Sequence, residues 1–191
     1  GQQSQSAGKE KTVQSLAKEF DASHSNMPDL DQKKNECAPT ATANSLLWLA
    51  AKGEYLDKLP QTAPELIDKL KTNFKWKEYG VDVKENYLTG KAETISQLGL
   101  PLETHAVGKP FDLNIVAKIA QEIDKGQDVE IDLAYFKMNP DGTGERIGGH
   151  MVTVVGARGT RDAQYLDIHD PATTGENKTE TYKINGSNVI D

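Results

Sequence analysis

The chain contains a single cysteine, Cys37, at the start of an apolar segment over residues 37–52. Pro39 indicates that a helix begins here, because proline lacks a backbone N–H and is tolerated only in a first helical turn. The free N–H groups of a helix N-terminus and the positive end of its dipole stabilise a thiolate. Cys37 therefore stands where a nucleophile is favoured. A small apolar side chain at the edge of a core is the alternative.

A base for such a thiolate is available in His150, which lies near the start of the apolar strand predicted at 148–157. A nucleophilic cysteine needs a base that also holds the thiolate as an ion pair. Gly148 and Gly149 precede the histidine and leave the backbone without side chains, so that a substrate chain could come close. A half-buried histidine at a strand end, without a chemical role, is the plainer interpretation.

Two acidic residues, Asp167 and Asp170, lie near the end of the strand predicted at 163–170. If this strand pairs antiparallel with 148–157, His150 and Asp170 lie side by side, because they are nearly symmetric about residue 160. We therefore expect Asp170, rather than Asp167, to accept a hydrogen bond from His150 and orient its ring. An Asp-Pro turn with no function would also explain Asp170.

In combination, Cys-x-Pro at a helix start, GGHMVTVVG in a later strand and a following strand that ends in Asp-Pro resemble the papain-like cysteine peptidases. The resemblance covers roughly residues 30–172 and is closest to the bacterial C39-type family. It implies Cys37 as the nucleophile, His150 as base and acid, and Asp170 as the orienting residue. It also implies Gln32 as a side-chain donor to the oxyanion hole, slightly closer to the cysteine than is usual in the family.

The activity that this resemblance implies is thiol-dependent hydrolysis, most simply by a peptidase, through an acyl-enzyme on Cys37. Two alternatives keep the same fold. One is a non-catalytic module that binds a peptide or partner protein, and the other is a transamidase or deamidase that uses the same cysteine. We expect a monomer with a peptide or protein substrate, with Gly148 and Gly149 at the substrate, and with no cofactor and no metal.

Composition argues against several other classes of function. The net charge of -7 speaks against nucleic acid and anionic membranes as partners, because phosphates are bound by clustered Lys and Arg. No segment approaches the roughly 20 apolar residues of a membrane span. A lone cysteine excludes an intramolecular disulfide framework and a CxxC metal site. The polar start GQQSQSAGKEK resembles a mature N-terminus from which a targeting segment has been removed, so we expect an exported or extracellular protein.

The elements that must position these residues fall into a helical part followed by a strand-rich part. Hydrophobic periodicity predicts helices at 37–52, 62–74, 91–100 and 112–126, then strands at 128–136, 148–157, 163–170 and 178–185. This order is typical of an α+β domain. With the resemblance, it predicts a papain-like fold whose N-terminal helical half, with its central helix, packs on a C-terminal antiparallel β-sheet.

The expected domain organisation is a short appendage followed by one domain. Residues 1–20 are predicted to form a polar tail and an N-terminal helical arm, in which residues 9–20 place Val13, Leu16 and Phe20 on one helical face. Residues 21–191 are predicted to form a single papain-like domain that begins with a loop over 21–36.

Overall fold

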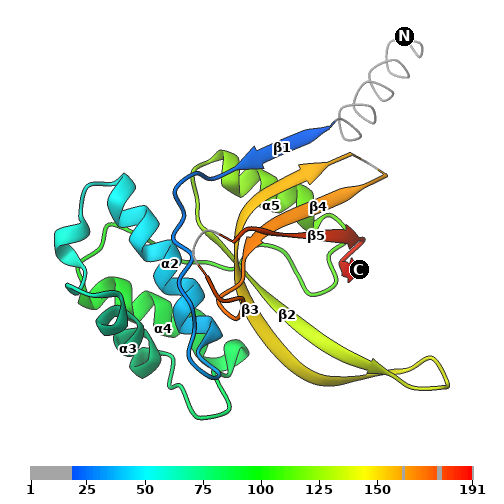
Figure 1. Ribbon diagram of the computed structural model, residues 1–191, viewed down its shortest axis with the longest axis horizontal. Coiled ribbons are helices and arrows are strands. Elements are labelled where there is room, and N and C mark those ends of the chain that lie inside the picture. Colours follow the sequence, from blue (N-terminus) through cyan, green and yellow to red (C-terminus); the bar gives the residue numbers. More distant parts are fainter. Residues whose placement is uncertain (1–18, 161, 176–177, 191) are drawn as a thin grey trace, which may run out of the picture.

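A computed structural model of the chain describes residues 19–160, 162–175 and 178–190. Its helices are α2 (Cys37–Lys52), the short 3-10 helix η1 (Leu56–Lys58), α3 (Ala63–Asn73), α4 (Val83–Gln97) and α5 (Ile115–Asp124). Its strands are β1 (Phe20–Ser23), β2 (Val129–Met138), β3 (Gly144–Gly159), β4 (Gln164–His169), β5 (Glu180–Asn185) and β6 (Asn188–Ile190). Helices and an antiparallel sheet therefore occupy largely separate parts of the chain, which confirms the α+β class (Figure 1).

The strands form one six-stranded sheet in which β3 is central. β3 pairs with β4 along one edge, and with β1 and β2 along the other. β5 and β6 extend the sheet beyond β4. Residues 144–152 of β3 pair only with β2 among the described residues, so these two strands leave the body as a long arm (Figure 1).

The strand β1 corrects the sequence prediction at the N-terminal side. Phe20 is predicted to end a helix and residues 21–36 to form a loop, yet Phe20–Ser23 pairs with residues 156–159 of β3. This edge strand gains its hydrogen bonds from a partner far away in sequence, which local periodicity does not reveal. The rest of the predicted arm, residues 1–18, lies outside the described residues.

Two helices differ from their predicted bounds. α4 begins at Val83, well before the predicted start at 91, because the Asp82 side chain caps it by accepting from the Glu85 N–H at 3.3 Å. Gly90 lies within this helix, and a Cβ there would be 2.6 Å from the Asn73 carbonyl oxygen, so glycine lets α4 approach α3. α5 begins after its predicted start, since Asp112 accepts from a nearby N–H in the preceding turn instead of capping the helix.

Helices cover both faces of the sheet. On one face α2 packs against β3, where Thr153 Oγ1 donates to the Ala41 carbonyl oxygen at 2.9 Å, and α3 and α4 share the apolar core of α2. On the other face α5 packs over Val152 and Val154 of β3. Alternate residues of one strand point to opposite faces, so β3 contributes to two separate cores. The prediction of one helical half is therefore wrong for α5, which lies across the sheet from the other helices.

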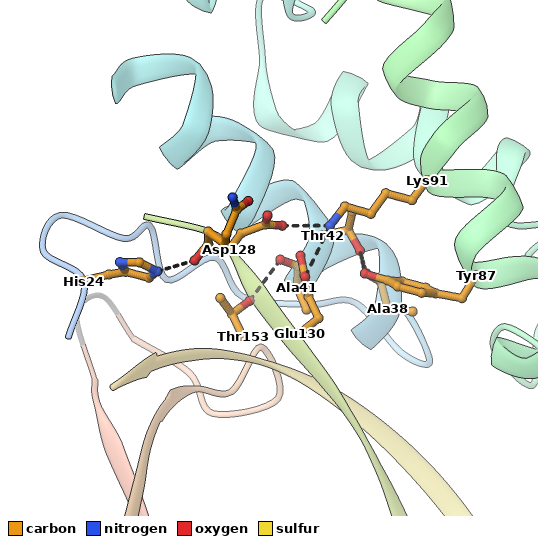
Figure 2. A network of polar contacts seen from close by, with 10 residues as sticks. His24, Ala38, Ala41, Thr42, Tyr87, Lys91, Asp128, Glu130 and Thr153 are labelled. Carbon is orange, nitrogen blue, oxygen red and sulfur yellow. Dashed lines mark hydrogen bonds and ion pairs between the residues drawn. The ribbon is translucent and has the colours of Figure 1, made fainter. Parts of the chain in front are cut away.

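A buried charge cluster of Lys91, Asp128 and Glu130 ties α4 to the start of β2 (Figure 2). Lys91 Nζ lies 2.7 Å from Asp128 Oδ2 and 3.3 Å from Glu130 Oε2. Burial raises the pKa of Glu130 to about 7; the Lys91 charge opposes this shift and the Asp128 charge adds to it. Burial also acts against ionisation of Asp128, but its ion pair with Lys91 lowers the pKa of Asp128 below the usual range. The single buried ammonium of Lys91 thus forms an ion pair with both carboxyl groups.

We expect Glu130→Gln to stabilise the fold at pH 8 and to change it little at pH 5. A carboxyl with a folded pKa near 7 and an unfolded value of 4.5 contributes stability that is complete below about pH 4.5 and is lost as the pH rises through 7. Glutamine imitates the protonated form at every pH. Urea denaturation should show a free energy of unfolding higher than wild type by up to roughly 3 kcal/mol at pH 8. The same difference from wild type at both pH values would contradict this assignment.

Candidate active site

Cys37 is the first residue of α2, as predicted, and its side chain is half-buried. Glu36 occupies the position before the helix, but no side chain caps this end. The Glu36 N–H donates to the Lys33 carbonyl oxygen, and Pro39 has no N–H. Within residues 19–160, 162–175 and 178–190, the N–H groups of Cys37 and Ala38 have no hydrogen-bond acceptor. The helix start therefore offers two free donors beside the thiol.

His150 and Asp170 form a pair just beyond the last paired residues of β3 and β4, where Thr153 lies opposite His169, so the β3–β4 register differs by two residues from the predicted symmetry about residue 160. His150 Nε2 lies 2.6 Å from Asp170 Oδ1, and the two side chains are 11% and 13% exposed. Asp170 Oδ1 also accepts the Ala172 N–H at 2.8 Å, which fixes the carboxylate. Asp167 instead binds the Arg158 guanidinium at 3.2 and 3.3 Å. The structure therefore selects Asp170 as the acid beside His150.

The charge state of this group follows from its contacts. Burial acts to lower the pKa of His150, but the hydrogen bond to Asp170 and the nearby Cys37 side chain outweigh it and raise the pKa to about 9. Burial likewise opposes ionisation of Asp170, yet the His150 ring and the Ala172 N–H bring the pKa of Asp170 below its usual range. At neutral pH the geometry favours an imidazolium between a carboxylate and the cysteine sulfur.

Gln32 is hydrogen-bonded to the turn that follows Asp170. Its backbone N–H donates to the Pro171 carbonyl oxygen at 2.8 Å, which holds the loop before α2 against the end of β4. The side-chain oxygen of Gln32 is buried, and the described part of the chain provides it with no hydrogen-bond partner. A buried amide without a partner is uncommon in a folded protein. The structure thus brings Gln32 to the His150–Asp170 side of the site, but shows no hydrogen bond from Gln32 to Cys37.

The glycines before His150 lie on the arm, opposite residues of β2. Gly148 pairs with Tyr135, and His150 pairs with Leu133. A Cβ at Gly148 would lie 3.8 Å from the Tyr135 ring, an ordinary contact, so the fold itself does not require glycine here. Gly149 has less room, because its Cβ would lie 3.0 Å from the Arg146 guanidinium. Gly148 therefore leaves open space on the same face of the arm as His150.

Tyr135 belongs to this site, although sequence reasoning does not select it. It lies two residues beyond Leu133, on the face of β2 that carries His150 on the neighbouring strand. Burial raises the pKa of its phenol, and the charges of Asp170 and Cys37 add to the shift. The alternation of the strand places Leu133 and Tyr135 on one face, but only the β2–β3 register places them beside His150.

Other kinds of site find less support in the described residues. Across these ranges, no group of three or more His, Cys, Asp or Glu side chains is arranged to hold a metal ion. None of the helices that the structure describes is long and apolar enough to cross a membrane. Comparison with known proteins finds no matching family model and no matching curated protein.

Proposed function

We propose that this chain is a thiol-dependent hydrolase with a papain-like, C39-type fold, most simply a peptidase, and that Cys37 is its nucleophile. The observation that carries this proposal is the pairing of His150 Nε2 with Asp170 Oδ1 at 2.6 Å, beside a Cys37 side chain close enough to contribute to the raised pKa of His150. Nucleophile, base and orienting acid occur in the order that the resemblance implies. His150 lies between the Asp170 carboxylate, which would orient it, and the Cys37 side chain, which it would activate.

The proposed reaction is acyl transfer to water. The Cys37 thiolate attacks the carbonyl carbon of an amide, and a C–S bond forms while the carbonyl oxygen becomes an oxyanion. The N–H groups of Cys37 and Ala38, with the Gln32 amide, donate hydrogen bonds to that oxygen. His150 gives its proton to the leaving amine as the C–N bond breaks, then accepts a proton from the water that cleaves the thioester. Asp170 keeps the His150 ring oriented and stabilises its charged form.

We further propose that the substrate is a polypeptide that passes beside the arm. The glycine backbone at 148 and 149 lets a chain approach His150 closely, and the exposed ring of Tyr135 borders the same space. Such a surface suits an extended peptide segment rather than a small amide.

The direct test is the reactivity of the thiol with iodoacetamide at pH 6. An ordinary cysteine is only about 0.3% thiolate at this pH, so an unactivated thiol is labelled slowly. We expect Cys37 to be labelled at least about tenfold faster than N-acetylcysteine. Labelling no faster than that free thiol would overturn the proposal.

Turnover is tested separately with a mixture of tryptic peptides analysed by mass spectrometry. The wild type should create new peptide termini, and Cys37→Ala, with its folding verified by circular dichroism, should create none. An added primary amine distinguishes hydrolysis from transfer, because a transamidase would attach the amine to the new carboxyl side. Equal cleavage by wild type and Cys37→Ala would exclude Cys37 as the nucleophile.

A further inference from the structure

Glu36, the residue directly before Cys37, has a carboxylate that is turned away from the helix start. Its side chain is 6% exposed, and Glu36 Oε1 lies 2.6 Å from Lys71 Nζ on α3. Although Glu36 stands at the capping position, its side chain makes no hydrogen bond to an N–H of α2. A buried carboxylate at a helix N-terminus would ordinarily be drawn to the free N–H groups there. Instead, the ion pair with Lys71 holds the Glu36 carboxylate away from these N–H groups.

The segment that follows α3 holds Lys71 and the residues before Cys37 together. Lys71 Nζ lies 4.0 Å from the centre of the Trp76 ring. Trp76 Nε1 donates to the Asn35 carbonyl oxygen at 2.7 Å, and Asn35 Nδ2 donates to the Glu78 carbonyl oxygen. Asn35 has a positive φ of 60°, which turns the chain sharply just before α2. Through Trp76, these contacts connect Lys71 to the backbone at Asn35, two residues before Cys37.

The charge of Glu36 matters because the proposed reaction places other negative charges at the start of α2. A thiolate on Cys37 and an oxyanion on a substrate would both be stabilised by the N–H groups and the dipole of α2. A free carboxylate one residue away would repel both and could occupy the same donors. The ion pair of Glu36 with Lys71 has no net charge as a whole and leaves the N–H donors of Cys37 and Ala38 open.

We propose that Lys71 is a positioning residue for the thiol reaction, acting through Glu36. By holding the Glu36 carboxylate away from the start of α2, Lys71 keeps the N–H groups there available to the Cys37 thiolate and the oxyanion. This inference rests on the proposed function, since it assigns a role to Lys71 only if Cys37 reacts as a thiolate.

The test is the pH profile of Cys37 labelling by iodoacetamide in Lys71→Met. We expect the pH of half-maximal labelling to rise by about one unit, so that the labelling rate at any pH well below this midpoint falls about tenfold. Lys71→Arg keeps the cation and should keep the wild-type profile. Lys69→Met is a matched control on the same helix, because Lys69 forms no ion pair among the described residues, and it should also leave the profile unchanged.

The double variant Lys71→Met/Glu36→Gln separates an action through Glu36 from a direct action on the thiol. With no carboxylate to restrain, Lys71→Met should have no effect on the profile, and the double variant should match Glu36→Gln within about twofold. A shift that persists in the Glu36→Gln background would overturn the inference. This comparison also decides the question if Lys71→Met alone fails to fold.

The failure of this inference differs from a failure of the proposed function. If wild-type Cys37 is labelled no faster than N-acetylcysteine, the proposed function is wrong and Lys71 has no such role. If wild-type Cys37 is labelled rapidly and Lys71→Met lowers the urea midpoint without moving the pH profile, only the inference is wrong. In that case Lys71 is a structural ion-pair partner.

Discussion

If the proposed function is right, a His150→Ala variant loses peptide hydrolysis by about 10²- to 10⁴-fold, because it removes the group proposed to move the proton in both halves of the reaction. Its Cys37 should also be labelled by iodoacetamide at pH 6 at the rate of an ordinary thiol, since the imidazolium that would hold the thiolate is gone. Both rates are measured on protein whose folding has been checked by circular dichroism. His105, an exposed histidine, supplies the matched control, and His105→Ala should retain both rates.

In the proposed reaction, the same histidine would set the upper pH limit. Because contacts with Asp170 and Cys37 outweigh burial and raise the pKa of His150 to about 9, the wild type should lose hydrolysis as the pH rises through about 9. The protonated ring also stabilises the fold: this contribution is complete below the unfolded value of 6.5 and is lost as the pH rises through 9. Asp170→Asn should move the limit to lower pH. A limit unaffected by Asp170→Asn would contradict the orienting role of Asp170.

Removal of the buried cation by Lys91→Met should cost about 3–5 kcal/mol in the free energy of unfolding at pH 7, the largest stability effect expected in this chain. The variant leaves the Asp128 carboxylate in the interior without a counter-charge, and it removes the charge that favours ionisation of Glu130. It also breaks the ionic link between α4 and the start of β2, visible in Figure 2. Urea denaturation measures the loss directly.

A matched control and a rescue make the Lys91 result interpretable. Lys125→Met removes a lysine that is 63% exposed and that pairs, among the described residues, only with Glu122, so its effect should stay within about 0.5 kcal/mol. Adding Glu130→Gln to Lys91→Met should recover part of the loss at pH 8, because glutamine is neutral in the interior without having to bind a proton. A loss below about 1 kcal/mol for Lys91→Met would mean that water reaches the cluster and screens it.

The candidate site was largely predictable from the sequence because its main signals are local. Pro39 indicates a helix start at Cys37, and the structure begins α2 at that residue. The two strands around residue 160 are close enough in sequence to pair as a hairpin, and this pairing brings the end of β4 near His150, whose Nε2 lies 2.6 Å from Asp170 Oδ1. A proline in a first turn and a short antiparallel connection need no knowledge of the rest of the chain.

Other members of the site depend on contacts between distant segments. Tyr135 reaches the His150 side of the arm through the register of β2 on β3, and a shift by one residue would turn it to the opposite face. Lys71 meets Glu36 because α3 packs on α2, although 35 positions separate the two residues in the sequence. No spacing rule links such pairs.

The sequence by itself determined the α+β class, the start of the central helix and the order of cysteine, histidine and aspartate, because periodicity, proline geometry and hairpin symmetry act over short stretches of chain. Only the tertiary structure decided that α5 covers the opposite face, that β1 joins the sheet, and that Lys91 is buried between two carboxylates. These features depend on which surfaces pack together and which charges are thereby removed from water. Such outcomes are set by the free energy of the whole fold rather than by any local pattern.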